Sequence, residues 1–129
     1  MPKFKKNEKL VSQNKIELLF RSGQTFFEYP FKVFWLMSDE LQEYPAQILI
    51  SVPKRSFKNA VTRNLIKRRI SEIYRKNKTI FYEKLAGMNR NCLFALIYTE
   101  HKVLNTADLE PKIIVILQRL TQENEKIVG

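Results

Sequence analysis

Apolar residues near the start of the chain recur at helical spacing. Ile16, Leu19 and Phe20 lie on one side of a helix that Ser12 can cap with its hydroxyl group. Gly23 follows, and glycine tolerates the left-handed conformation in which many helices end. The pattern therefore predicts a short first helix between Ser12 and Gly23.

The next part of the chain has the short apolar runs of β-strands. Residues 25–27 and 31–37 are rich in aromatic and β-branched side chains, which predicts two short strands or one bent strand. After a turn at 39–45, residues 47–52 predict another strand, and together these runs indicate an antiparallel meander. Residues 92–99 are apolar at almost every position, which is typical of an interior strand.

Alternation within residues 31–37 separates two faces of that strand, because successive side chains point to opposite sides. We assign the face that carries Phe31, Val33 and Trp35 to the core. The opposite face mixes a cation with apolar side chains, and it consists of Lys32, Phe34 and Leu36.

Two further segments have a helical period. In residues 59–77 an apolar stripe spans an arc of roughly 80°, so this helix should pack on the sheet. The stripe consists of Ile66, Ile70, Ile73 and Tyr74. Residues 112–120 contain a β-branched run that also suits a strand, but Asp108 can cap a helix there and the apolar spacing is helical, so we predict a helix. The predicted order is α-β-β-β-α-β-α.

Length and charge narrow the kind of protein. The chain has 129 residues, which is the size of one domain and excludes a second catalytic domain. Its net charge is +10, and residues 54–78 hold ten basic side chains against one acid, Glu72. This stretch therefore carries +9 of the total. Such an imbalance favours a polyanionic partner, either a nucleic acid or an acidic membrane surface.

Cysteine and histidine are too few for several kinds of site. Cys92 and His101 are the single members of their types, which excludes an intramolecular disulfide and a zinc site of the usual kind. We assign no catalytic residue and no metal ligand to the chain, and we expect Cys92 to be a buried, inert thiol. The basic N-terminus is followed by no apolar signal segment, and no apolar run is long enough to span a membrane. We therefore expect a cytoplasmic protein.

The cations of the second helix gather beside its apolar stripe. Asn64, Lys67, Arg68, Ser71 and Arg75 fall between roughly 40° and 140° on the helical wheel, which makes one polar strip about three turns long. A solvated helix face is the alternative interpretation. With so few acids nearby, self-repulsion is not offset by ion pairs, and this favours binding of a nucleic-acid backbone. Lys54 and Arg55 extend the basic region from the preceding loop, or they only aid solubility.

The residues of this helix also carry a family resemblance. The segment Phe57-Lys58-Asn59-Ala60-Val61-Thr62-Arg63-Asn64-Leu65-Ile66-Lys67-Arg68-Arg69-Ile70 resembles the signature of the bacterial ribonuclease P protein subunit, and Leu19-Phe20-Arg21-Ser22-Gly23 resembles the end of its first helix. The resemblance covers roughly residues 9–122. It divides the chain into a basic N-terminal arm at 1–9, an RNA-binding domain at 10–122 and a C-terminal tail at 123–129.

The resemblance implies both a fold and a function. The fold would be an α+β two-layer sandwich with a four-stranded sheet and a left-handed β-α-β crossover. The function would be to bind the catalytic RNA of ribonuclease P and to support removal of the 5′ leader from precursor tRNA. The RNA would perform the hydrolysis with Mg²⁺, which the RNA would mainly hold. The implied partners are that RNA and precursor tRNA, and no obligate protein partner is evident.

Roles carry over only at matching positions. The residues expected to contact RNA are Lys54, Arg55, Asn59, Arg63, Asn64, Lys67, Arg68, Arg69 and Arg75. Phe20 and Phe34 match aromatic residues that contact the leader, although each could instead be a packing residue of the core. Leu65 and Ser71 depart from the basic pattern of the family, and Arg69 and Arg75, one turn further on, could restore the charge. Ile16 stands where many relatives have an aromatic residue.

Two other functions compete with this one. An independent protein nuclease would need a cluster of acids for metal-assisted phosphodiester chemistry, and the sequence has none that is apparent. A non-catalytic RNA-binding or DNA-binding protein, such as a ribosomal protein or a helix-turn-helix regulator, remains the alternative. A helix-turn-helix regulator needs a second helix and a tight turn before its basic helix. Residues 45–53 instead predict a strand, which Pro53 ends.

Overall fold

The predicted order of helices and strands is confirmed in a computed structural model, which describes residues 8–38 and 44–128. The predicted turn falls largely on residues 39–43, which lie outside the described residues. The elements are α1 (Gln13–Ser22), β1 (Gln24–Glu28), β2 (Phe31–Ser38), β3 (Ala46–Ser51), α2 (Ala60–Gly87), β4 (Asn91–Tyr98) and α3 (Thr106–Val128).

The sheet is mixed, and its strand order is β1-β2-β4-β3. β1 and β2 form an antiparallel hairpin, but β3 pairs in parallel with β4, so the predicted meander is wrong for β3. The reason lies in β4, where residues 92–96 are at most 2% exposed. A strand that is buried on both faces takes an interior position, and β4 therefore separates β2 from β3. α2 makes the crossover between the parallel strands, and the left hand of that crossover stays a prediction.

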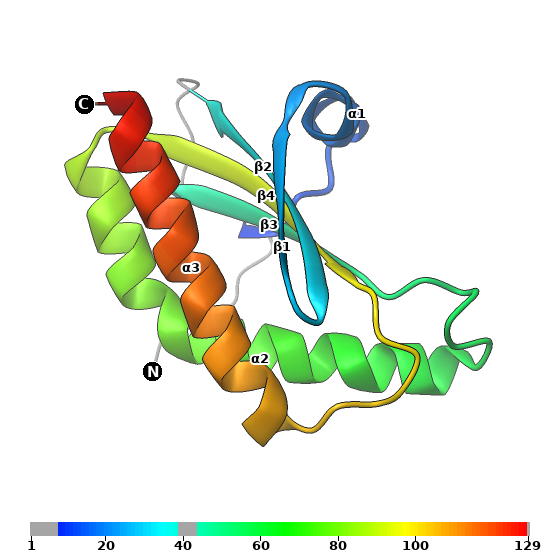
Figure 1. The fold of residues 1–129 in the computed structure, drawn as a ribbon. Helices are drawn as coiled ribbons and strands as arrows, with labels where there is room; N and C mark the ends of the chain where they lie inside the picture. The colour runs from blue at the N-terminus through cyan, green and yellow to red at the C-terminus, as the bar shows by residue number, and fades with distance from the viewer. Residues whose placement is uncertain (1–7, 39–43, 129) are drawn as a thin grey trace.

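Helices cover the two faces of the sheet unequally. Figure 1 shows α2 and α3 side by side on one face and α1 alone against the other. The predicted apolar stripe of α2 is confirmed, because all four of its side chains are at most 1% exposed. Phe31, Val33 and Trp35 also lie in this core, as predicted. The sheet and the α2/α3 layer therefore form the sandwich, and α1 leaves part of the opposite face uncovered.

Helix α1 begins as predicted but ends differently. The Ser12 hydroxyl accepts a hydrogen bond from the Lys15 amide, so the predicted cap is confirmed. Gly23 follows the helix with φ −72° and ψ 159°, an extended conformation and not the left-handed one that we expected. A Cβ atom at this position would lie 2.4 Å from the Leu19 carbonyl oxygen and 2.9 Å from that of Trp35. Close approach of two backbone segments is therefore what requires glycine here.

Helix α2 is about ten residues longer than the predicted segment 59–77. Phe81 and Leu85 continue its buried face, and the helix ends only when Asn89 takes a left-handed φ of 52°. The Arg90 amide then donates to the Leu85 carbonyl, which satisfies one of the last carbonyl groups of the helix. Gly87 is the last residue of the helix.

Helix α3 confirms that residues 112–120 are helical. Its N-terminal cap is Asn105, whose side chain accepts from the Asp108 amide at 2.8 Å, and Asp108 lies in the first turn. The Asp108 cap that we predicted is thus wrong by three residues. The helix runs to Val128, so helical structure continues past the boundary at residue 122 that the sequence suggested for a tail.

A buried ion pair joins the N-terminal segment to α2. Glu8 is fully buried, and its Oε1 accepts from the Lys78 ammonium at 2.5 Å and from the Tyr82 hydroxyl at 2.6 Å. The Leu10 amide then donates to the Ile48 carbonyl on the edge strand β3. The N-terminal arm thus ends before residue 8, because Glu8 is anchored. Residues 1–7 of the arm lie outside the described residues.

Removal of one partner from this pair should leave a buried charge without compensation. We expect Glu8→Ala to lower the free energy of unfolding by about 3–5 kcal/mol in urea denaturation. Glu17→Ala, which removes an exposed acid from α1, is the control and should change it by less than about 0.5 kcal/mol. The double variant Glu8→Leu/Lys78→Met should regain most of the loss, since it removes both charges. Wild-type stability of Glu8→Ala would contradict this account.

Candidate nucleic-acid interface

Three of the predicted contact residues lie together in the N-terminal part of the polar strip of α2. Asn64 and Arg68 are exposed, and Lys67 is half-buried, on the side of the helix next to the buried stripe. A helix displays residues three and four apart on one surface, so these side chains follow one another along about one turn. Ammonium, guanidinium and amide groups in such a row can bind successive phosphate groups of a nucleic acid.

This strip borders a groove at the edge of the sheet. Lys67 and Ser71 line it from α2, residues 48–50 line it from β3, and residues 9–11 close its other side. The volume of the groove is about 250 Å³. Ser71, where the family pattern has a basic residue, therefore faces a recess that Lys67 and Lys9 flank with positive charge.

The loop before α2 adds exposed cations at one end of the strip. Lys54 and Arg55 are exposed in a turn that follows β3. The Arg63 guanidinium donates to the carbonyl groups of Phe57 and Lys58 at 2.7 and 2.9 Å, so it fastens this loop to α2. The Asn59 side chain accepts from the Val61 amide and caps the helix. Asn59 and Arg63 thus have structural roles at positions where we predicted RNA contacts.

Two of the predicted cations have protein partners. Arg69 donates to the Leu104 carbonyl at 2.9 Å, on the other side of the buried stripe from Lys67. Arg75 pairs with Glu72 at 2.9 Å, and this hydrogen bond lowers the pKa of the Glu72 carboxyl group. Arg69 is therefore separate from the strip and does not restore charge beside it. Lys78, which the sequence counted among the cations of this region, is buried against Glu8.

An aromatic cluster lies on the sheet face that α1 partly covers. The rings of Phe20 and Phe34 meet edge to face, with their centroids 4.7 Å apart. Phe20 remains 41% exposed, and the Lys32 Nζ atom lies 5.2 Å from the centre of the Phe34 ring. The predicted pair is thus brought together. Lys32 was not among the predicted site residues, although strand alternation already placed it on this face.

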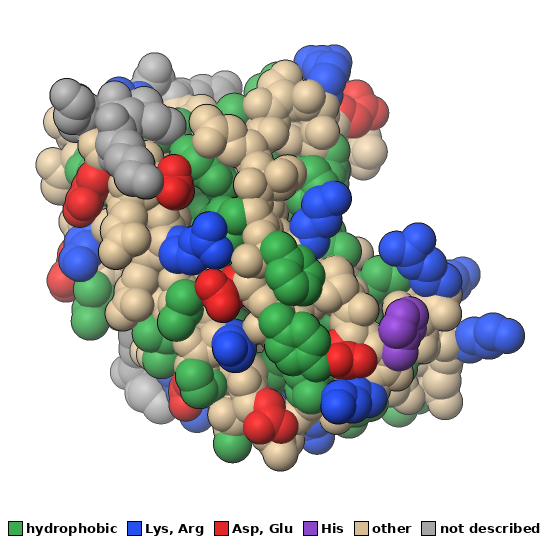
Figure 2. Space-filling model, viewed as in Figure 1, with side chains coloured by type: hydrophobic (Ala, Val, Ile, Leu, Met, Phe, Trp, Pro, Cys, Tyr) green, Lys and Arg blue, Asp and Glu red, His purple; other side chains and the backbone are tan. Residues whose placement is uncertain are grey.

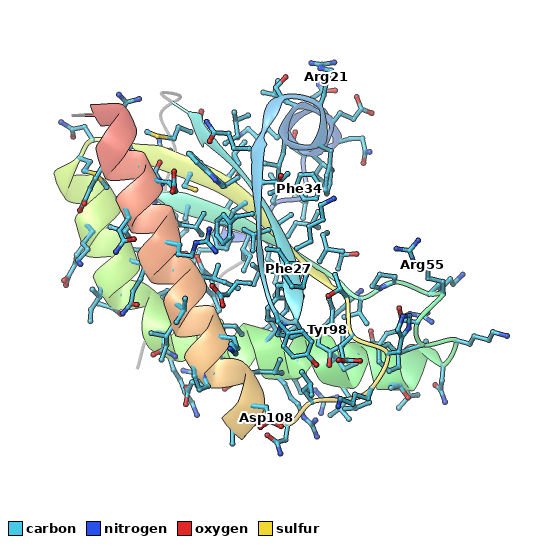
Figure 3. The ribbon with its side chains drawn as sticks, viewed as in Figure 1. Arg21, Phe27, Phe34, Arg55, Tyr98 and Asp108 are labelled. Atoms are coloured by element: carbon cyan, nitrogen blue, oxygen red, sulfur yellow. The ribbon has the colours of Figure 1, made fainter. Side chains whose placement is uncertain are left out.

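Figures 2 and 3 show how these surfaces are arranged. In Figure 3, Arg21 lies on α1, Phe34 below it, and Arg55 on the loop before α2. The outline in Figure 2 is hollowed between α1 and that loop, and Lys and Arg side chains stand on both sides of the hollow. Positive charge therefore stands beside the open part of the sheet face that α1 only partly covers.

The single cysteine and the single histidine lie at opposite ends of β4. Cys92 is buried, as expected, and burial raises the pKa of its thiol to about 12. His101 is exposed in the loop after β4. Across residues 8–38 and 44–128 no three His, Cys, Asp or Glu side chains are placed to hold a metal ion. The helices described are also too short or too polar to cross a membrane.

The fold and the surface together define a class. The chain is a small basic α+β protein with a cationic strip on a docked helix and a partly open aromatic face on the other side of the sheet, and both features suit contacts with a nucleic acid. Residues 4–121 match the family model described as Ribonuclease P. This match spans most of the chain, and the chain therefore belongs to the ribonuclease P protein family.

Relatives of known name agree with this assignment. The chain is 35% identical over 80 residues to the ribonuclease P protein component of Porphyromonas gingivalis strain ATCC 33277, which covers 62% of this chain and 58% of that protein. It is 38% identical over 78 residues to the same component of Petrotoga mobilis, which covers 60% and 63%. Each match thus spans less than two thirds of the relative.

The similarity to solved structures concerns the fold. The RNase P protein of Staphylococcus aureus superposes with a TM-score of 0.69 at 20% identity, and the match covers 89% of this chain and 96% of that one. The RNase P protein of Thermotoga maritima gives 0.67 at 20% identity, with coverage of 87% and 96%. The α+β fold inferred from the sequence is thereby confirmed.

The helix strip should govern the salt dependence of RNA binding. For a bacterial ribonuclease P RNA, we expect Lys67→Ala and Arg68→Ala each to reduce the slope of log K against log salt by about 0.7–0.9 per lost phosphate contact. Lys76→Ala, which removes an exposed cation from another side of α2, is the matched control and should leave the slope unchanged. Binding titrations at several salt concentrations measure these slopes. Equal slopes for all variants would place the interface elsewhere.

Proposed function

We propose that this chain is the protein subunit of a bacterial ribonuclease P and binds the catalytic RNA through α2. The observation that carries the proposal is the family motif on a docked helix whose outer strip presents Asn64, Lys67 and Arg68. The buried stripe fixes the helix on the sheet, so the backbone that carries the strip is already in place before binding. A fixed helix suits a folded RNA, because little backbone freedom is lost on binding.

The aromatic face binds the 5′ leader of precursor tRNA in this proposal. Phe20 is exposed beside Phe34, and Lys32 supplies a cation at the same place. Aromatic rings stack on any base, so such a face tolerates many leader sequences. Lys54 and Arg55 extend the positive charge toward the N-terminal end of α2.

The cleavage itself belongs to the RNA in this proposal. Mg²⁺ would supply charge stabilisation and an activated water, and we assign it to the RNA, because the described residues of this chain contain no cluster suited to a metal ion. The chain contributes binding and orientation of the leader, and it supports endonucleolytic maturation of the tRNA 5′ end. We place this activity in the cytoplasm.

Reconstitution tests the proposed function. The protein is mixed with a bacterial ribonuclease P RNA at low Mg²⁺, and cleavage of precursor tRNA is followed. We expect the mixture to cleave the 5′ leader, while the protein alone cleaves nothing and the RNA alone is slow. A mixture no faster than the RNA alone would contradict the proposal and favour a non-catalytic RNA-binding protein.

The aromatic pair should distinguish precursor from mature tRNA. We expect Phe20→Ala and Phe34→Ala to weaken binding of the reconstituted complex to precursor tRNA by about 1–3 kcal/mol each if each ring stacks on a base. Binding to mature tRNA should stay the same. Val115→Ala, which trims an exposed apolar residue of α3, serves as control. Equal losses for both ligands would return these two residues to a packing role.

A further inference from the structure

Phe27 is a large apolar side chain that the fold leaves uncovered. It is 56% exposed, more than Phe20 at 41%. Its neighbour Phe26 is the residue of β1 that packs against the core, with the Arg119 guanidinium 4.0 Å above its ring. Because adjacent residues of a strand face opposite sides, Phe27 lies on the face of the sheet that carries Phe34. The core therefore does not account for a phenylalanine at this position.

The strand register places Phe27 beside the aromatic cluster. Phe27 stands opposite Lys32, and Thr25 stands opposite Phe34. Phe27 and Phe34 are thus diagonal neighbours across an antiparallel pair, a relation that separates such residues by about 7–8 Å. Lys32 is the cross-strand partner of Phe27, and its Nζ atom lies beside the Phe34 ring two residues further along β2.

A cross-strand row continues from Phe27 across the sheet. Lys32 is opposite Ile97 on β4, and Ile97 is opposite Ser51 at the end of β3. The chain then leads from Ser51 into the exposed turn with Lys54 and Arg55. This row runs parallel to the one that contains Phe34, and in Figure 3 Phe27 lies farther along the sheet from α1 than Phe34 does.

We infer that Phe27 and Lys32 form a second binding position for a nucleotide of a single-stranded RNA. The base stacks on the Phe27 ring, and the Lys32 ammonium contacts the adjoining phosphate. A bound leader then passes from the Phe20–Phe34 pair to Phe27 along the open half of the sheet. This inference rests on the proposed function, and it adds a residue that neither the motif nor the helical pattern identifies.

The experiment compares two ligands on the complex reconstituted with a bacterial ribonuclease P RNA. Affinities for precursor tRNA with an eight-nucleotide leader and for mature tRNA are measured under conditions in which cleavage is too slow to interfere. We expect Phe27→Ala and Phe27→Leu to lower the ratio of these affinities about fivefold or more. Phe27→Trp should keep the ratio, because it keeps an aromatic face.

Further variants separate the possible results. Ile80→Ala removes a side chain that is 66% exposed on α2 and should keep the wild-type ratio. If Phe27→Ala keeps the ratio while Phe20→Ala lowers it, the second position is wrong and the proposed function stands. If Phe20→Ala and Phe34→Ala keep it as well, leader binding by this face is wrong. An equal loss in Phe27→Trp or Ile80→Ala would also overturn stacking at Phe27.

Discussion

The packing of α2 against the sheet positions the cationic strip and the groove beside it. Its buried stripe, which includes Ile66 and Ile70, is fixed against the interior strand β4 and its parallel neighbour β3. Because the helix makes the crossover between these two strands, it cannot rotate without exposing that stripe. Its charged side is therefore directed outward along the edge of β3. The buried pair of Glu8 and Lys78 attaches the N-terminal segment to the same helix, which closes the groove beside Lys67.

The two faces of the sheet differ in how far helices cover them. On the α2/α3 side, aromatic and aliphatic side chains form the main core. On the other side, α1 and Leu10 bury a small second cluster around Leu19 and Leu93, and the rest of the face stays open. Apolar side chains left on an open face normally weaken solubility, whereas here Lys32 lies among them. An aromatic face with a cation offers a stacking surface for bases and a charge for phosphates.

Periodicity predicted much of this structure, but not the pairing of distant parts. It gave the order of elements and the buried stripe of α2, because each depends on local side-chain spacing. It placed β3 beside the wrong strand, since alternation shows which face a strand buries and not which neighbour it has. It could not pair Glu8 with Lys78, which are 70 residues apart. The family resemblance led us to expect an RNA contact at Arg69, whereas the guanidinium of Arg69 donates to the Leu104 carbonyl, which lies 35 residues away in the sequence.

The central claim is that α2 binds the catalytic RNA and the open sheet face binds the leader. Site-specific crosslinking in the reconstituted complex tests this division most directly. A photoreactive side chain at Arg68 and another at Thr25, which pairs with Phe34, report on the two surfaces separately. We expect Arg68 to crosslink to the catalytic RNA and Thr25 to the leader of precursor tRNA. Crosslinks from both positions to the same RNA, with none to the leader, would contradict the account.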